Sequence, residues 1–178
     1  MNVSDVKDRF DRGEQLDYLF FWSHRSNPDG SIGKTCFSQW FEASFERDGI
    51  RYRTAEHYMM ASKSRLFDDR ALLPEILAAN HPRQTQTLGR KIHGFEEAIW
   101  NEHRFQIVVA GNLAKFQQNP QLKAYILGTQ DRILVEASPD DRIWGIGLAA
   151  DNPNIHNPHF WQGTNLLGFA LMEVRSRL

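Results

Sequence analysis

The sequence has a single cysteine, Cys36, so no disulfide within the chain can hold the fold together and no thiolate cluster can bind zinc. No apolar run approaches the roughly 18 residues that a membrane-spanning helix needs. Residues 1–17 are polar and charged, without the apolar core of a signal peptide. The chain also has almost no net charge, because 21 Lys and Arg balance 22 Asp and Glu. This balance disfavours a protein that binds polyanions in general. We therefore expect a soluble protein of the reducing cytoplasm, with no membrane contact.

Hydrophobic residues make up 41% of the chain and aromatic residues 12%, which is typical of a folded protein. No internal repeat and no Pro/Gly/Ser-rich linker divides the 178 residues, a length that suits one domain. We expect an N-terminal arm or short helix over residues 1–17 and one domain over residues 18–178. The oligomeric state is left open.

The pattern of apolar residues predicts several helices and a few short strands. Asp48-Gly49 is a turn dipeptide and predicts a hairpin over residues 45–53, and Thr54 is placed to cap the helix that follows. Strands are predicted at 18–22 and 133–137, and helices at 55–67, 72–79, 82–92, 95–118, 120–127 and from Thr164 or Asn165 to about Arg177. Strand–helix alternation typical of a doubly wound sheet is missing, so we predict a mainly α fold, an α+β single domain with few strands.

Three short motifs suggest other chemistry but lack their context. Gly33-Lys34-Thr35 resembles the end of a phosphate-binding P-loop, but Pro28 stands where that loop needs glycine. His156 and His159 have no obvious third metal ligand, and we expect no metal. Cys36 lies in no recognisable nucleophile signature.

Three segments hold a more informative combination of residues. Glu56 falls in the first turn of a predicted helix, where complementing the helix dipole is the plain structural explanation. Residues 136–147 combine three acids, an arginine and Trp144 with Gly145-Ile146-Gly147, which suggests that the backbone approaches something closely. Residues 161–168 place amides and small residues at a helix start, a natural seat for an anion.

The sequence resembles the YbiA-like, or NADAR, family. The pieces that carry the resemblance run in order from residue 20 to residue 168: residues 20–22, 37–41, 52–60, Lys63, 66–69, 88–90, Trp100, 115–116, 134–138, 140–147 and 161–168 without Thr164. The family has mainly helical single domains. Some members are similar to an N-glycosidase that releases ribose 5-phosphate from early riboflavin-pathway intermediates, and others are linked to removal of ADP-ribose from modified nucleobases.

The resemblance also implies site residues. The acid of the family's "EHY" motif corresponds to Glu56, and the tryptophan of its "WG" motif corresponds to Trp144. Some relatives carry an acid where this chain has Ile146, so an assisting role falls to Asp140, Asp141 or Glu136, or is absent. The loop from Arg25 to Gly30 is short or missing in shorter relatives, which suggests a different substrate preference.

From the chemistry of ribosyl C–N cleavage, we expect Glu56 to stabilise positive charge on the sugar and to deprotonate the attacking water. We expect Trp144 to stack on the flat base, with Phe21, Trp22 and Trp40 as further stacking candidates and core packing as the alternative for each. Lys63, two turns from Glu56 on the same helix face, and Arg25 are candidates for phosphate contacts, with a solvated surface lysine as the alternative for Lys63. Asp140 and Asp141 are candidates for the ribose hydroxyls or for a second acid, with loop capping as the alternative. Gly145 is a further substrate-binding candidate, and Asn165 is expected either to bind phosphate or to cap the final helix.

The expected partner is a small phosphorylated ribosyl substrate, and the reaction needs no cofactor. Two alternatives remain at this point. One is an ADP-ribosyl hydrolase that acts on modified nucleic acid, in a groove flanked by Arg47, Arg51 and Arg53. The other is a non-catalytic module that binds ADP-ribose or an NAD-related nucleotide.

Overall fold

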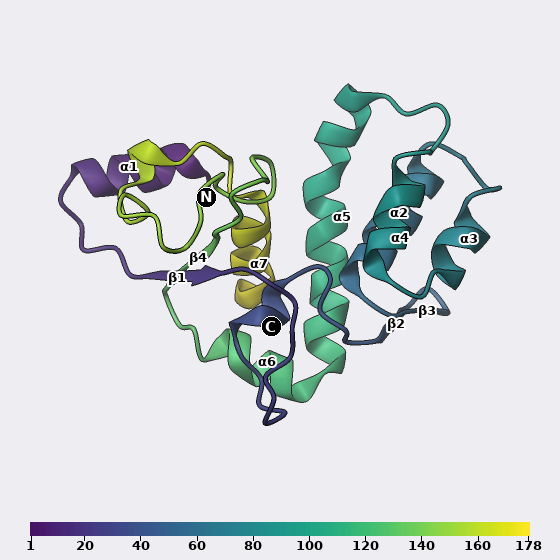
Figure 1. The fold of residues 1–178 in the computed structure, drawn as a ribbon, viewed down its shortest axis with the longest axis horizontal. Coiled ribbons are helices and arrows are strands. Elements are labelled where there is room, and N and C mark those ends of the chain that lie inside the picture. Colours follow the sequence, from purple (N-terminus) through teal and green to yellow (C-terminus); the bar gives the residue numbers. More distant parts are fainter. The chain divides into compact units, whose positions relative to one another are not determined.

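The computed structural model describes residues 1–178. The chain divides into two compact units. The central unit is residues 39–120, and the discontinuous unit combines residues 1–38 with residues 121–178. Helices are the main regular structure of both units, and the strands are short (Figure 1). The predicted mainly helical fold with few strands is confirmed. None of the helices combines the length and the apolar character that crossing a membrane requires.

The central unit begins with the predicted hairpin and continues with helices. Its elements are β2 (Phe45–Arg47), β3 (Ile50–Tyr52), α2 (Ala55–Leu66), α3 (Leu73–Ala78), α4 (Pro82–Gly89) and α5 (Glu97–Gln118). Asp48 and Gly49 have φ angles of 54° and 72°, which are the positive values that a tight hairpin turn uses. The Thr54 hydroxyl accepts a hydrogen bond from the His57 amide, so the predicted cap of α2 is confirmed.

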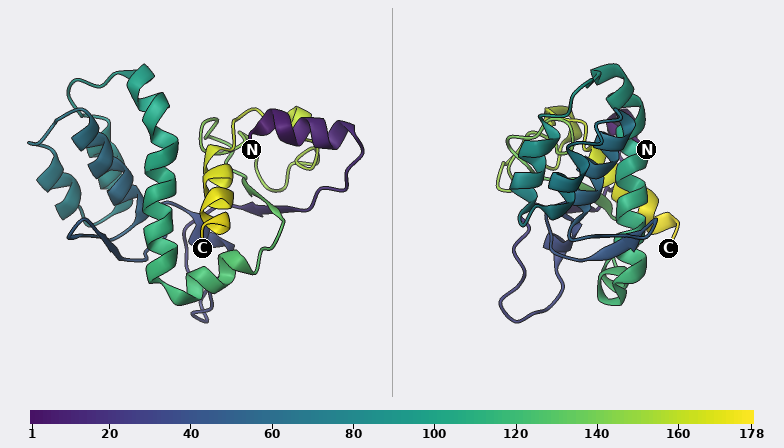
Figure 2. Two further views of the ribbon diagram at one scale, coloured as in Figure 1. Left: turned by 180° about the vertical axis from the view of Figure 1, so that it is seen from behind. Right: turned by 90° about the vertical axis from the view of Figure 1, so that its right-hand side faces the viewer.

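Helix α2 is the buried element of the central unit. It packs against α4 and α5, which lie beside it in Figures 1 and 2. Gly111 of α5 faces the Tyr58 ring so closely that an added Cβ would overlap the ring. Gly89, at the end of α4, faces Met60 in the same way. These glycines allow close helix packing and thereby fix the position of α2.

The discontinuous unit brings together the two ends of the chain. Its elements are α1 (Val3–Asp11), β1 (Tyr18–Phe21), the 3-10 turn η1 (Lys34–Phe37), α6 (Pro120–Leu127), β4 (Ile133–Glu136), the 3-10 turn η2 (Pro158–Phe160) and α7 (Leu166–Ser176). β1 and β4 pair in parallel, with Tyr18 opposite Ile133 and Phe21 opposite Glu136. The two strands were predicted separately, but their pairing was not.

Helix α7 packs on β4, and Asn165 joins the two elements. Its side-chain Nδ2 donates to the Leu134 carbonyl at 2.9 Å, and its Oδ1 accepts from the Glu136 amide at 2.9 Å. Asn165 occupies the N-cap position of α7, one of the two positions predicted, but its side chain makes no capping hydrogen bond. An amide that donates and accepts at once replaces a missing strand neighbour better than it caps a helix.

Candidate active site

Glu56 lies in the first turn of α2, and only 2% of its surface is exposed. Its amide donates to the Gln39 carbonyl at 2.9 Å, which fixes the start of the helix against the preceding segment. The amide groups at a helix N-terminus favour an anion there. Complementing the dipole would not by itself require burial, so the burial points to a further role for the carboxylate.

A buried amide pair supports the backbone at Glu56. Asn112 of α5 donates from Nδ2 to Gln39 Oε1 at 2.7 Å and to the Val108 carbonyl at 2.9 Å. Asn112 is fully buried and Gln39 is 7% exposed. Because the Gln39 carbonyl receives the Glu56 amide, α5 is linked through Gln39 to the first turn of α2. The sequence prediction missed this link, although a lone asparagine among apolar residues of a core helix was a usable signal.

Lys63 lies two turns after Glu56 on α2. Its Nζ donates to the Gly89 carbonyl at 2.9 Å and lies 4.1 Å from the centre of the Phe95 ring and 5.5 Å from that of Trp100. Loss of hydration lowers the pKa of the ammonium, and the negative charge of Glu56 acts in the opposite direction. Glu56 and Lys63 therefore influence each other electrostatically along one helix.

Phe95 and Trp100 were not among the predicted site residues. The Phe95 ring is 43% exposed and meets the edge of Phe67, with the ring centres 5.3 Å apart, whereas Trp100 is 9% exposed. An exposed ring held in place by a second ring is a good surface for a flat ligand. Trp40, which was predicted, is partly buried and stands edge-on to His81 at 6.0 Å.

His57 follows Glu56 but is occupied by structural contacts. Its Nε2 lies 3.0 Å from the Ala79 carbonyl and its Nδ1 lies 2.8 Å from the Thr54 hydroxyl. A carbonyl can only accept, so Nε2 carries the proton and Nδ1 accepts from Thr54. Burial lowers the pKa of the imidazole, which keeps the ring neutral. His57 thus joins the start of α2 to the end of α3.

In the discontinuous unit, Asp141 holds the loop that carries Trp144. Its Oδ1 accepts from the Ile143 amide at 2.8 Å and from the Trp144 amide at 2.7 Å. This is the loop-capping role that the sequence allowed as an alternative. Asp140 is exposed and Trp144 is partly buried. The side chain of Ile146, at the position where some relatives carry an acid, is fully buried in the core.

The close backbone approach expected at Gly145 is an approach to the protein's own chain. A Cβ at Gly145 would lie 2.9 Å from the Glu136 carbonyl oxygen and 3.0 Å from that of Asp141. The backbone N–H of Asn165 donates to the Gly145 carbonyl at 3.1 Å. Gly145 and Asn165 therefore bring the Trp144 loop, β4 and the start of α7 together.

The other predicted residues of this unit differ in exposure. Phe21 is 1% exposed and meets the edge of Phe37 at 5.3 Å, as a core residue does. Trp22 is 54% exposed, and Arg25 is exposed as well. His156 packs edge-on against Phe20 at 5.1 Å, and His159 Nε2 lies 2.8 Å from Asp11 Oδ1.

Comparisons with known proteins agree with this architecture. The model of the NADAR domain family matches residues 20–178. N-glycosidase R617 of Acanthamoeba polyphaga mimivirus is 40% identical over 163 residues, which covers 89% of this chain and 94% of that protein. N-glycosidase YbiA of Escherichia coli is 30% identical over 142 residues, which is 80% of each chain. The NMR structure of E. coli YbiA superposes with a TM-score of 0.70 at 29% identity, over 92% of this chain and 86% of that one.

The chain therefore belongs to the NADAR family, and the resemblance inferred from its motifs is confirmed. Several of its relatives are N-glycosidases, so the class of protein that the fold and the sequence define is a hydrolase of N-glycosidic bonds.

Proposed function

We propose that the protein hydrolyses the C–N bond of a phosphorylated ribosyl compound, such as an early riboflavin-pathway intermediate of the 5-amino-6-ribosylamino-uracil phosphate type, and releases ribose 5-phosphate. The observation that carries this proposal is the buried carboxylate of Glu56 at the N-terminus of α2, with Lys63 two turns away. This combination supplies a fixed negative charge on a rigid element, which is what cleavage at an anomeric carbon requires.

The reaction needs a carboxylate and one water molecule. As the C1′–N bond breaks, positive charge develops on the ribose, and the Glu56 carboxylate stabilises it. The water oxygen then forms the new bond to C1′ and Glu56 accepts the proton that the water loses. This proton passes on to the leaving nitrogen, which returns Glu56 to its carboxylate form. Because Glu56 is buried, its charge is poorly screened and acts more strongly than an exposed carboxylate would.

The remaining predicted residues are proposed to bind substrate or support the loops that do. Trp144, Trp22 and Trp40 offer rings that are at least partly accessible, whereas Phe21 fits a core role. Asp140 is the better candidate for ribose hydroxyls or a second acid, because Asp141 already accepts two loop amides. Phosphate contacts are assigned to Lys63 and Arg25, and loop support to Gly145 and Asn165.

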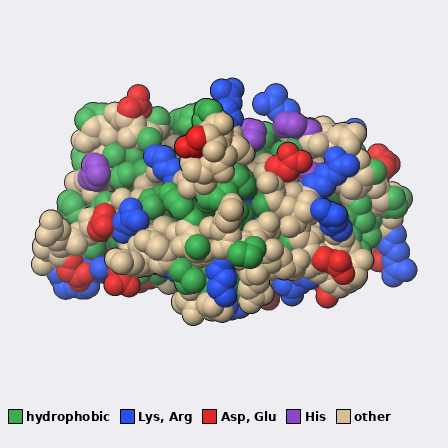
Figure 3. Space-filling view, turned by 90° about the horizontal axis from the view of Figure 1, so that it is seen from below, with side chains coloured by type: hydrophobic (Ala, Val, Ile, Leu, Met, Phe, Trp, Pro, Cys, Tyr) green, Lys and Arg blue, Asp and Glu red, His purple; other side chains and the backbone are tan.

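Action on modified nucleic acid is less well supported. That alternative needs Arg47, Arg51 and Arg53 to flank a groove. Arg47 Nη1 donates to the Ala110 carbonyl at 3.0 Å, and Arg53 Nη1 donates to Asn80 Oδ1 at 2.9 Å, so two of the three have partners within the protein. Basic and acidic side chains are interspersed on the face drawn in Figure 3.

The test is incubation of the purified protein with ribosylamino-uracil phosphate and, separately, with an ADP-ribosylated guanine oligonucleotide, with released sugar as the readout. We expect turnover of the first substrate and a loss of about 10²–10³-fold in kcat for Glu56→Gln. Undiminished turnover by Glu56→Gln would exclude Glu56 from the mechanism. Turnover of the oligonucleotide alone would favour the nucleic-acid alternative, and tight ADP-ribose binding without turnover of either would favour a binding module.

A further inference from the structure

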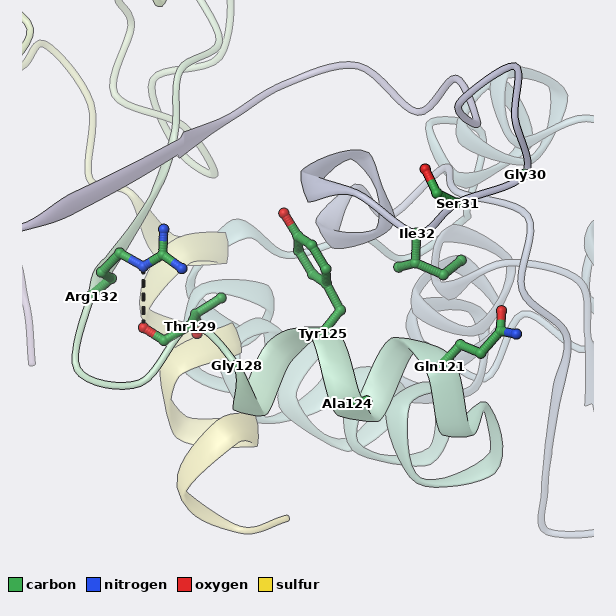
Figure 4. Close-up of a pocket in the computed structure, with 9 residues that line it drawn as sticks. All are labelled: Gly30, Ser31, Ile32, Gln121, Ala124, Tyr125, Gly128, Thr129 and Arg132. Atoms are coloured by element: carbon green, nitrogen blue, oxygen red, sulfur yellow. Dashed lines mark hydrogen bonds between the residues drawn. The ribbon is translucent and has the colours of Figure 1, made fainter.

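A hollow of about 550 Å³ lies in the discontinuous unit, outside the residues assigned to the reaction (Figure 4). Its volume is within the range of sites for small organic ligands, about 300–1,000 Å³. One wall is the loop from Gly30 to Ile32, and the others are α6 and the turn that follows it. The lining residues are Gly30, Ser31, Ile32, Gln121, Ala124, Tyr125, Gly128, Thr129 and Arg132.

Arg132 supplies the only formal charge among the lining residues. Its Nε donates to the Thr129 carbonyl at 3.3 Å, and no residue of the protein accepts from its two Nη nitrogens. Figure 4 shows the guanidinium extending toward the side of the hollow where Tyr125 stands. A half-buried guanidinium with its Nη groups available is suited to binding a carboxylate or phosphate.

The turn that carries Arg132 is itself held in place. Arg175 Nη1 donates to the Thr129 hydroxyl at 2.7 Å and to the Arg132 carbonyl at 2.9 Å. The carbonyls at the end of α6 also have partners, since Ala124 and Ile126 accept the amides of Gly128 and Thr129. The negative end of the helix is therefore largely satisfied, and Arg132 is the only charged residue that lines the hollow.

Tyr125 provides a second donor and a flat wall. Its ring lies 5.5 Å from that of Phe37, which fixes its orientation. Burial and the neighbouring Cys36 raise the pKa of the phenol above its usual value, although Arg132 opposes this, so the hydroxyl keeps its proton. Ile32 and Ala124 add apolar surface beside the ring.

The loop wall of the hollow is ordered by its own hydrogen bonds. Asn27 Nδ2 donates to Ser31 Oγ at 3.0 Å, and Asp29 Oδ1 accepts the Ser31 hydroxyl at 2.7 Å and its amide at 2.9 Å. The carboxylate of Asp29 is thus engaged within the loop and does not line the hollow.

We propose that this hollow binds a small organic anion, a flat ring that carries a phosphate or carboxylate group, with Arg132 as the anion ligand and Tyr125 as a second donor. The guanidinium and the phenol O–H face the acidic group, and the ring lies against Tyr125, Ile32 and Ala124. None of the residues that line the hollow is assigned to the reaction proposed for Glu56.

The test is a calorimetric titration with phenyl phosphate, benzoate, inorganic phosphate and benzamide, the neutral counterpart of benzoate. We expect saturable binding of phenyl phosphate or benzoate, weaker binding of inorganic phosphate and none of benzamide. The two ring-bearing probes distinguish the phosphate and carboxylate forms of the ligand. Arg132→Gln should weaken binding about 10–100-fold and Tyr125→Phe about 2–10-fold, the usual effects of losing a charged and a neutral hydrogen bond.

Arg12→Gln is the matched control, because Arg12 belongs to the same unit but pairs only with the exposed Glu14. Neither this variant nor Glu56→Gln should change the affinity. An Arg132→Gln variant that binds as tightly as wild type, or no saturation by either ring-bearing probe, would overturn the proposal. Equal affinity for inorganic phosphate and phenyl phosphate would overturn the ring contact. Tyr125→Phe, which keeps the ring, gives a second readout should Arg132→Gln fail to fold.

Discussion

Replacing Asn165 by alanine should destabilise the protein strongly, although the sequence suggested a role for Asn165 at the substrate. The side chain is fully buried and serves two backbone groups of β4, the Leu134 carbonyl and the Glu136 amide. Leaving a buried polar group without a partner costs about 1–3 kcal/mol, so the two together cost about 2–6 kcal/mol. Asn165 also has φ of 51°, where alanine costs about 1–2 kcal/mol more than glycine or asparagine.

Urea unfolding of wild type, Asn165→Ala and Asn165→Gly measures these two contributions separately. Both variants lose the hydrogen bonds, but only alanine is strained at this backbone conformation. We expect Asn165→Ala to lose at least about 3 kcal/mol and Asn165→Gly to be about 1 kcal/mol more stable than Asn165→Ala. A loss below about 1 kcal/mol for Asn165→Ala, or an alanine variant more stable than the glycine variant, would refute this reasoning.

Three further changes test the central unit. Folding lowers the pKa of His57, so below about pH 6.5 the unfolded state binds more protons and the free energy of unfolding falls as the pH drops. His57→Gln should flatten this pH dependence in unfolding curves between about pH 5 and 7. An unchanged slope would contradict the assignment. Gly111→Ala gains up to about 1 kcal/mol of helix propensity but forces a methyl group against the Tyr58 ring. We expect the free energy of unfolding to fall by about 1–2 kcal/mol and Tm to fall with it. A rise in Tm would contradict the close packing. Asn112→Leu removes the buried amide link to Gln39 and should lower kcat about tenfold with a smaller change in KM, whereas an unchanged kcat in a folded variant would exclude Asn112 as a positioning residue.

Local signals were enough to predict the α-helices and strands from residue 18 onward, although not the two 3-10 turns. Asp48-Gly49 specifies its hairpin by its own backbone preferences, and Thr54 caps α2 through a residue three positions away. The pairing of β1 with β4 joins residues more than 100 positions apart, and four-residue strands carry no information about their partner. The contacts of the Asn165 side chain could not be predicted for the same reason, since its hydrogen-bond partners lie in a distant strand.

The candidate site was predictable only in part. The first-turn position of Glu56 and its shared helix face with Lys63 follow from helical periodicity. The partners of Lys63 do not, because Gly89 and Phe95 reach it from the end of α4 and the loop beyond it. Periodicity indicates which residues share a face but gives no information about what packs on that face.

Two features of the central unit favour a negative charge at Glu56. The amides at the start of α2 and the charge of Lys63 favour a negative group at this position. His57 is kept neutral by burial and by its bonds to Thr54 and Ala79, so it does not compete as the base. The Gln39–Asn112 pair also fixes the backbone at Glu56, so in the proposed mechanism the carboxylate is in place before substrate binds. A charge fixed in advance needs no rearrangement when the sugar becomes positive, which is the main advantage that a protein site has over water.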